Sequence, residues 1–330
     1  MAQQPMVGIG DPMPRITLPS GSGAVFDSLD PGLAGMARLY WLGEPPAPSE
    51  PMATALDGCE TLLHVVLPAP PADPDAHASW MVDKAGELRR AFAASGSLAV
   101  LVDSAGRVAD LVVDPTPPAV VAAAEALFRA SAPVMVGAKA PVLLIERIIE
   151  PAFGRVLLDY WERHEKLVNT LGSETGNVAN ADVKRRQDVQ LDDPGLFVAL
   201  RDRIVRRVLP LMEQAFHARI GVIEAPMIGC YPASTGGWFR AHRDNTSRFN
   251  AHRQYALTMN LNGPEDYDGG TVRFPEFGRE LYRPPKGGGV VFSCSLLHEV
   301  LPVTRGRRFG VFTFLSATGP SASAGPRPGR

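Results

Sequence analysis

The sequence comprises 330 residues, which is enough chain for two domains of ordinary size, each with its own buried core. Hydrophobic residues account for 45% and charged residues for 21%, the composition of a globular protein rather than a disordered or membrane-embedded one. The formal net charge of −2 gives no electrostatic reason to expect nucleic acid or an anionic membrane as a partner.

Residues 1–135 have the pattern of an α/β domain. Compact apolar runs at 37–43 and 61–68 predict buried strands, and 98–114 predicts a strand, a turn and a second strand. Two helices are expected as well, one within 75–95 from the helical spacing of its apolar residues, and one at 117–130.

The connector to the next domain is expected within 131–140. A strand at 141–149 and an amphipathic helix at 150–166 then open a domain over 136–318. The polar, Gly- and Asn-rich segment 169–184 is interpreted as a mobile loop or lid. A helical pattern over 193–219 contains Pro210, which should kink the helix or divide it in two.

From Ile220 onward, short β-rich runs alternate with turn clusters. The seven runs are APMIGCYPA, WFRAHRD, YALTMNL, GGTVRFPEF, GGGVVFSC, HEVLPV and RRFGVFTFL. Strands at this spacing predict a sandwich or barrel of antiparallel strands. Residues 319–330 have the composition of a disordered tail.

The three cysteines, Cys59, Cys230 and Cys294, are far apart and form no Cys-x-x-Cys pair, which suits a reducing compartment. The first residues lack the features of a signal peptide, and no apolar run reaches the roughly 18 residues of a membrane span. We therefore expect a cytoplasmic protein that does not bind a membrane.

Two candidate metal ligands, His242 and Asp244, lie in the strand-like run GGWFRAHRDN. Seven histidines and 35 acids in 330 residues give about 0.7 His-x-acid pairs by chance, so the pair alone is weak evidence. Side chains at i and i+2 of a strand point to the same side and can contact one ion. His298, just before a later strand, can add a second imidazole, and such a set leaves three coordination positions free for catalysis.

Arg308 follows ten residues after His298 on a predicted strand. An arginine that points into the core needs an anion, and its planar fork matches a carboxylate with two parallel hydrogen bonds. A dicarboxylate that chelates the metal at one end could place its far carboxylate there. That co-substrate would be 2-oxoglutarate.

With these residues in place, the chain from about Pro141 to Ala317 resembles the prolyl-4-hydroxylase-like branch of the Fe(II)/2-oxoglutarate-dependent dioxygenases. The motif is His-x-Asp, a distant His, and an Arg or Lys about ten residues later. The segments YPASTGGWFRAHRDN, EDYDGGTVRFPEFG and HEVLPVTRGRRF resemble the sequences around that motif. The resemblance implies an α+β domain with a double-stranded β-helix, or jelly roll.

By this resemblance His242, Asp244 and His298 hold iron and are catalytic, and Arg308 binds the distal carboxylate of 2-oxoglutarate. Arg307 takes that role if the spacing is one residue shorter. Tyr231 occupies the position of a tyrosine that helps to bind the co-substrate. Thr258 or Asn260 on the next strand is a further candidate, because the phase of that strand is open.

The N-terminal domain resembles a thioredoxin-fold peroxiredoxin in two segments, GIGDPMPRITLPSGSGAVFDSLD and LAVLVDSAGRVADLVVD. A peroxidase needs a low-pKa cysteine near a helix N-terminus. Only Cys59 lies in the corresponding stretch, without the usual Pro and Thr partners. We interpret residues 1–135 as a thioredoxin-like docking or dimerisation module, through which a homodimer could form. A thiol peroxidase that uses Cys59 is the alternative.

Several residues have simpler interpretations. The basic run Lys184-Arg185-Arg186 is expected to be a solvated face. His252 is a rival metal ligand, but it lies near a predicted turn. His164 and Glu162 are expected to be exposed on a helix.

The expected function is that of an iron(II)- and 2-oxoglutarate-dependent hydroxylase that uses O2, with ascorbate as a candidate reductant, and releases succinate and CO2. Hydroxylation is favoured because the halogenating relatives replace the carboxylate of Asp244 with a small residue. The resemblance suggests a protein or peptide side chain, such as proline, as substrate, and a free amino acid or small metabolite is an alternative. The hypothesis from another class is a metal- or peptide-binding module without turnover.

Overall fold

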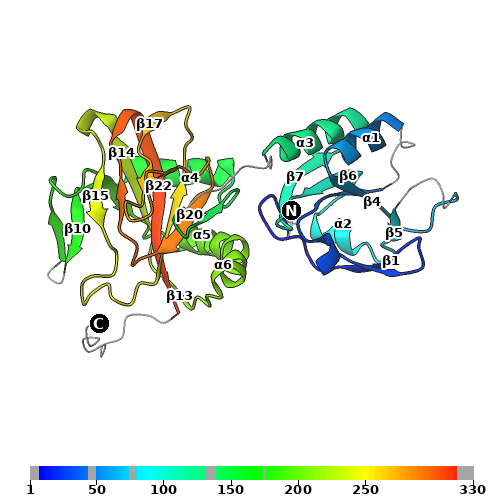
Figure 1. Cartoon of the computed structure of the whole chain (residues 1–330), viewed down its shortest axis with the longest axis horizontal. Helices are drawn as coiled ribbons and strands as arrows, with labels where there is room; N and C mark the ends of the chain where they lie inside the picture. Colours follow the sequence, from blue (N-terminus) through cyan, green and yellow to red (C-terminus); the bar gives the residue numbers. More distant parts are fainter. Residues whose placement is uncertain (1–6, 44–49, 74–78, 131–138, 174–175, 318–330) are drawn as a thin grey trace. The chain divides into compact units, whose positions relative to one another are not determined.

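The structure is a computed structural model that describes residues 7–43, 50–73, 79–130, 139–173 and 176–317. The chain divides into two compact units, Met1–Met135 and Val136–Arg330 (Figure 1). The predicted tail at 319–330 and most of the predicted connector lie outside the described residues.

The N-terminal unit is built on a mixed five-stranded sheet in the order β5-β4-β3-β6-β7. Strands β5, β4 and β3 run parallel, and β6 and β7 are antiparallel to their neighbours. The strands of the unit are β1 (Thr17–Pro19), β2 (Val25–Asp27), β3 (Ala37–Leu42), β4 (Thr61–Leu67), β5 (Trp80–Val82), β6 (Leu98–Val102) and β7 (Val108–Val113). Its helices are η1 (Pro31–Leu33), α1 (Glu50–Gly58), α2 (Glu87–Ala91) and α3 (Pro117–Ala130).

Two hydrophobic clusters cover the two faces of this sheet. Alternation along β3 explains the division, because Leu39 and Trp41 pack with α1 and α3 while Tyr40 and Leu42 pack with β1 and α2. The α/β character expected from the sequence is therefore confirmed. The thioredoxin-like identity stays a prediction.

The helix expected within 75–95 is wrong for its first half. Residues Trp80–Val82 form β5, which pairs in parallel with β4, and only Glu87–Ala91 are helical. The Asp83 carboxylate accepts hydrogen bonds from the amides of Glu87 and Leu88 and so fixes where the helix begins. Tertiary pairing with a buried neighbouring strand overrides the local helical spacing.

The C-terminal unit contains one large and one small antiparallel sheet. Its helices are α4 (Pro151–Arg163), α5 (Pro194–Arg207), α6 (Leu209–Phe216) and η3 (Ala233–Thr235). The large sheet contains β8 (Leu143–Ile145), β9 (Leu167–Val168), β12 (Gln187–Gln190), β13 (Val222–Ile223), β14 (Met227–Pro232), β16 (Tyr255–Asn260), β17 (Tyr267–Gly269), β20 (Gly289–Ser293) and β22 (Val303–Ser316). The small sheet contains β15 (Phe239–His242), β18 (Val272–Arg273), β19 (Leu281–Tyr282) and β21 (His298–Val300).

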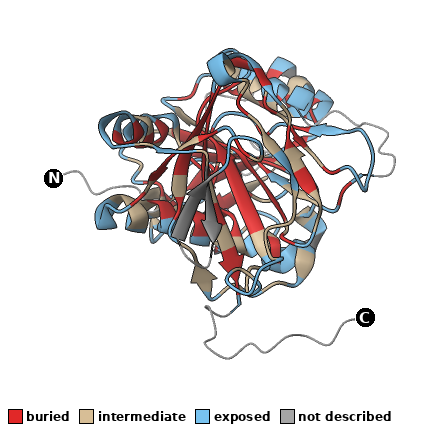
Figure 2. Cartoon of the chain, turned by 90° about the vertical axis from the view of Figure 1, so that its left-hand side faces the viewer, coloured by how far each residue is buried: buried red, intermediate tan, exposed pale blue. Residues whose placement is uncertain are grey.

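Each face of the large sheet has its own core. Helices α4, α5 and α6 pack on the outer face, while the inner face packs against the small sheet. In Figure 2 the strands between these layers are largely buried and the outer helix surfaces exposed. Two facing antiparallel sheets with helices on one side match the jelly-roll-like arrangement expected for this region.

The segment 169–184 differs from the predicted loop. It contains a hairpin of β10 (Thr170–Ser173) and β11 (Gly176–Ala179), followed by residues that pair with β15. The helical pattern over 193–219 does divide, since α5 ends at Arg207 and Pro210 lies in the first turn of α6. None of the helices in the described ranges is long and apolar enough to cross a membrane.

Candidate metal centre and co-substrate pocket

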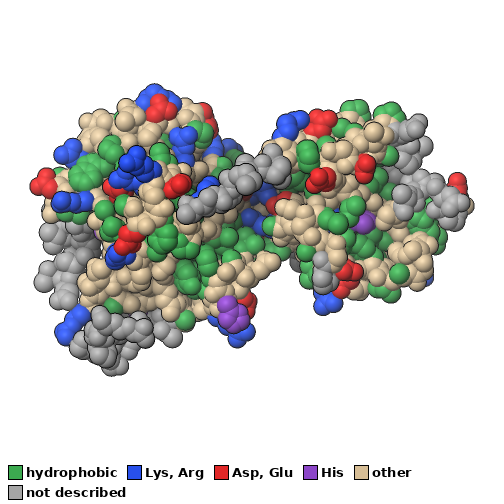
Figure 3. Space-filling view, viewed as in Figure 1, with side chains coloured by type: hydrophobic (Ala, Val, Ile, Leu, Met, Phe, Trp, Pro, Cys, Tyr) green, Lys and Arg blue, Asp and Glu red, His purple; other side chains and the backbone are tan. Residues whose placement is uncertain are grey.

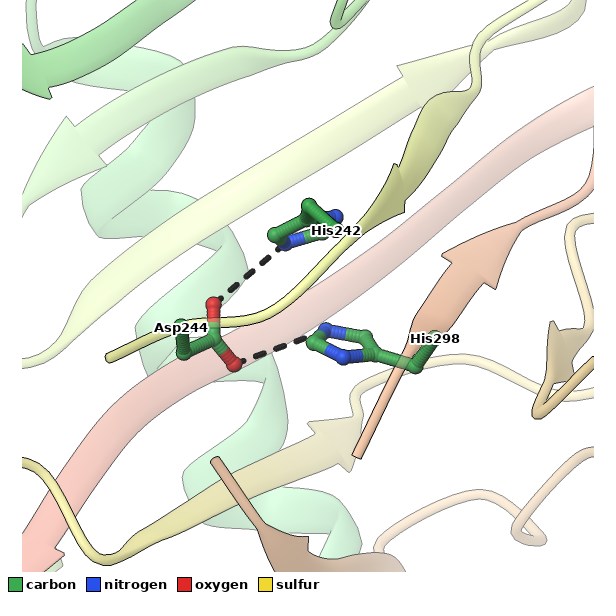
Figure 4. A group of neighbouring side chains, drawn as sticks. All are labelled: His242, Asp244 and His298. Carbon is green, nitrogen blue, oxygen red and sulfur yellow. Dashed lines mark ion pairs between the residues drawn. The ribbon is translucent and has the colours of Figure 1, made fainter. Parts of the chain in front are cut away.

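Three metal-ligating side chains converge at one end of the inner cavity (Figure 4). His242 ends β15 and faces His298 of β21 directly in the antiparallel register, and Asp244 follows two residues after His242. The Nε2 atoms of His242 and His298 lie 3.3 and 3.4 Å from the two carboxylate oxygens of Asp244. One ligand atom from each residue lies within 4.8 Å of the others, so one ion can contact all three.

The backbone selects which nitrogen of each imidazole faces this point. His242 Nδ1 lies 2.7 Å from the carbonyl oxygen of Arg240, and His298 Nδ1 lies 3.1 Å from that of Leu296. A carbonyl can only accept, so each Nδ1 donates its proton and each Nε2 keeps a free lone pair. This is the tautomer that a metal ion requires.

Aromatic rings hold the two imidazoles. The ring of Phe239 stacks on His242 at a centroid distance of 3.8 Å, and Phe292 lies 4.7 Å from His298. Burial lowers the pKa of His298, which favours its neutral form. Burial alone would raise the pKa of Asp244, but the two histidines outweigh it and keep this carboxyl anionic.

Arg308 lies deeper in the same cavity, with only 1% of its surface exposed. Its Nε and Nη2 donate to Oδ1 of Asn260 at 3.2 and 3.0 Å. Its buried Nη1 has no hydrogen-bond partner among the described residues. Asn260 is in turn fixed by donating from Nδ2 to the Pro284 carbonyl at 2.7 Å. A buried guanidinium with one face held and one nitrogen free fits a site for a carboxylate.

The strand register decides the phase that was open in the sequence. On β22, Arg308 lies on the inner side, whereas Arg307 points outward, is 54% exposed and pairs with Glu162 of α4 at 3.4 Å. On β16, Thr258 and Asn260 are separated by two residues and both lie on the inner face, while Met259 packs with the helices.

Tyr231 of β14 is 1% exposed and pairs in register with Arg308. Its hydroxyl oxygen accepts a hydrogen bond of 3.2 Å from Nη1 of Arg186. Because that oxygen already accepts from Arg186, its own proton is free to be donated to a ligand in the cavity.

The solvated face expected for Lys184-Arg185-Arg186 is wrong for two of the three residues. Lys184 and Arg186 are buried, and both form ion pairs with the fully buried Asp188, at 2.8 and 2.5 Å. Only Arg185 is exposed. Burial lowers the pKa of Lys184 to about 8, and Arg186 contributes to the shift.

This ion cluster of Lys184, Arg186 and Asp188 was missed because basic runs are usually solvated. The signal was the alternation, since the three charges occupy every second position and therefore share one face of a strand. The fold makes room for them with Gly229, where a Cβ atom would lie 2.6 Å from the Asp188 carboxylate and 2.8 Å from the Phe312 ring.

A second unpredicted contact joins the segments that carry the ligands. Arg243, between His242 and Asp244, forms a bidentate ion pair with Glu276 at 2.6 and 3.1 Å. Glu276 also accepts from the amide of Leu297, next to His298, at 3.3 Å. One carboxylate thus braces both arms of the triad.

The rival residues lie elsewhere. His252 is bonded to Glu224 at 2.9 Å rather than to the triad, and His164 is exposed and stacks on Tyr160. Cys59 is buried and follows the C-terminal end of α1. The negative end of a helix disfavours a thiolate, which argues against the peroxidase alternative.

Comparison with known proteins places this region among described families. The family described as the 2OG-Fe(II) oxygenase superfamily matches residues 226–316. A PKHD-type hydroxylase of Teredinibacter turnerae is 32% identical over 158 residues, which cover 45% of this chain and 67% of that protein.

A PKHD-type hydroxylase of a Synechococcus strain is 32% identical over 105 residues, 30% of this chain, and the match spans only 46% of that relative. The crystal structure of a Pseudomonas putida prolyl-4-hydroxylase aligns with 55% of this chain and 95% of its own, at a TM-score of 0.41 and 20% identity.

Proposed function

This chain belongs to the 2OG-Fe(II) oxygenase superfamily, and we propose that it hydroxylates an unactivated C–H bond of a protein or peptide side chain, with proline as the first candidate. Iron(II) and 2-oxoglutarate are the cofactors, and succinate and CO2 are the co-products. The observation that carries the proposal is the triad of His242, Asp244 and His298, with two Nε2 lone pairs directed at one carboxylate.

The residues divide the work between two ends of the cavity. His242, Asp244 and His298 hold iron(II), which together with 2-oxoglutarate and O2 supplies the oxidising chemistry. Arg308 holds the far carboxylate of 2-oxoglutarate through its free Nη1, and Asn260 fixes the guanidinium. Tyr231 donates its hydroxyl proton to the same co-substrate. Thr258, on the inner face of β16, lines the pocket between them.

The class of reaction is supported by two facts. Asp244 retains the carboxylate that a hydroxylase keeps, and the relatives of this region are named as PKHD-type hydroxylases. Loss of the aspartate carboxylate would leave two imidazoles, which are too few protein ligands for the facial arrangement.

The test is succinate formation by the purified full chain with iron(II), 2-oxoglutarate and ascorbate. We expect a proline-containing peptide mixture to raise succinate above the level of a His242→Ala control, with a +16 mass product in the same sample. Free amino acids in a parallel reaction test the small-metabolite alternative. Absence of succinate above the control with every substrate would support the non-catalytic binding module instead.

We infer for the N-terminal unit a thioredoxin-like docking or dimerisation role. Its mixed sheet, covered by helices on one face, and the position of Cys59 after a helix rather than before one support a scaffold without thiol chemistry. Light scattering of the full chain tests dimerisation. A monomer at all concentrations would leave docking of another partner as the role.

A further inference from the structure

The N-terminal unit contains a group of buried polar side chains that the proposed hydroxylase reaction does not use. Arg38 and Tyr40 lie two residues apart on the same face of β3, and His64 of β4 pairs in register with Tyr40. Their exposed fractions are 5%, 0% and 7%. We call these three residues the Arg38 cluster.

The rings of the Arg38 cluster lie against one another. Tyr40 and His64 stack at a centroid distance of 5.3 Å, and Phe26 of β2 covers His64 at 5.0 Å. Burial lowers the pKa of His64 to about 4, and the charge of Arg38 is a second cause. Burial raises the pKa of Tyr40, and Arg38 offsets part of that rise. The guanidinium therefore lies near both rings.

Each member of the cluster has a buried polar atom without a hydrogen-bond partner among the described residues. These atoms are Nε of Arg38, the hydroxyl oxygen of Tyr40 and Nε2 of His64. Buried polar groups in native proteins are almost always paired, so three such atoms in one cluster indicate a bound group.

Charge determines what kind of group it is. Arg38 donates from Nη1 to the carbonyl of Ser28 at 3.1 Å, but it forms no ion pair with any acidic side chain in the described ranges. An uncompensated buried cation is strongly destabilising, and a bound anion would remove that cost.

All three orphan atoms can donate to one anion. His64 Nδ1 lies 3.0 Å from the hydroxyl of Ser79; when that hydroxyl donates, Nε2 carries the ring proton. Arg38 Nε–H and the Tyr40 hydroxyl are donors in any case. The depth of burial leaves no room for an organic tail, so the ligand is monatomic or nearly so.

We propose that the Arg38 cluster of the N-terminal unit binds one halide ion, with chloride as the natural ligand. The site is independent of the iron centre and gives this unit a ligand of its own.

The first test is a crystal of the full chain grown in sodium bromide, with anomalous data collected at the bromine edge. We expect an anomalous peak within hydrogen-bonding distance of Arg38 Nε, the Tyr40 hydroxyl and His64 Nε2. Ordered water at that point, with no anomalous signal, would overturn the proposal.

The second test measures chloride binding in solution through the broadening of the 35Cl NMR line, at constant ionic strength with gluconate as the replacing anion. Tyr40→Phe keeps the ring and removes one donor, and Arg38→Met removes the charge. We expect chloride affinity to fall about tenfold or more in each, the loss typical of a charge-assisted contact. Arg15→Met, which removes an arginine that is 68% exposed in the same unit, serves as the matched control.

Line broadening that is equal in the wild type, Tyr40→Phe, Arg38→Met and Arg15→Met would contradict the site, because it would come from surface chloride alone. If Arg38→Met does not fold, Tyr40→Phe decides the question, since a ring that stays in place preserves the packing.

Discussion

Arg308 and Arg307 are neighbours in sequence and opposites in environment. Arg308 is buried against Asn260, whereas Arg307 is half exposed beside Glu162. We expect Arg308→Met to weaken 2-oxoglutarate binding about 100-fold or more, because a buried bidentate contact is lost, while iron(II) binding persists. Anaerobic calorimetric titration with 2-oxoglutarate measures this.

Arg307→Met is the matched control for that experiment and should bind 2-oxoglutarate like the wild type. The reverse result, with Arg307→Met impaired and Arg308→Met normal, would show that the co-substrate lies on the other face of β22.

Arg186 should act through Tyr231 as a positioning residue. Its guanidinium donates to the tyrosine oxygen and so directs the hydroxyl proton into the cavity. Arg186→Met leaves Lys184 and Asp188 as a balanced ion pair, so the fold should survive. We expect about a tenfold rise in KM for 2-oxoglutarate with little change in kcat, and partial recovery in Arg186→Lys.

Tyr231→Phe distinguishes this role from a purely structural one. The effects of Arg186→Met and Tyr231→Phe on KM should not add in the double variant, because both act on the same proton. Additive effects would mean that the two side chains act separately.

At this scale the sequence predicts the residues that share a known spacing. His242, Asp244, His298 and Arg308 stand in a pattern that needs no structure to be seen. Lys184, Arg186 and Asp188 were not predicted, since only strand pairing with β14 shows that this polar segment enters the core. The choice between Thr258 and Asn260 also needed the register, which shows both on the inner face.

At the scale of elements, the triad depends on two segments being held together by the contact of Arg243 with Glu276. Glu276→Gln keeps the size of the side chain but loses the charge. We expect iron(II) to dissociate about tenfold faster, the usual effect of losing an outer partner of a metal site. Stopped-flow transfer of iron to a chelator measures the rate, and Glu280→Gln, a nearby exposed acid, should leave it unchanged. Equal rates in both variants would remove the brace from the account.

The helical layer is attached by Glu150, which precedes α4 and pairs with Arg203 and Arg207 of α5. Burial would raise the pKa of Glu150, but hydrogen bonds from the two arginines lower it to about 2, against an ordinary value of 4.5. A lowered carboxyl pKa adds stability that is complete above pH 4.5 and is lost as the pH falls toward 2. The free energy of unfolding of Glu150→Gln should therefore vary less with pH in this window, as urea titrations at several pH values can measure. A parallel pH dependence in the two proteins would contradict the assignment.

Element types were predictable where the pattern was long and regular, as for α3, α4 and the hairpin of β6 and β7. They failed where tertiary pairing decides. The apolar positions of β5 have helical spacing in the sequence, yet β4 captures them as a strand. The hairpin of β10 and β11 carries no apolar alternation that could announce it.

At the scale of the whole molecule, composition predicts the absence of a single-sign surface. Figure 3 shows acidic and basic side chains interspersed on the visible face, in agreement with a net charge of −2. The two units have hydrophobic clusters of their own, which is the organisation expected for a chain of this length. What each unit binds could not be read from composition, because it depends on a few buried side chains in each.

The central claim is that His242, Asp244 and His298 hold one iron(II) ion that 2-oxoglutarate then chelates. Anaerobic addition of iron(II) and 2-oxoglutarate to the full chain, followed by visible absorption, tests it most directly. We expect a weak metal-to-ligand band that saturates at one iron per chain and is absent in His242→Ala and in His298→Ala. A band of equal strength in these variants, or no band in the wild type at saturating iron and 2-oxoglutarate, would contradict the account.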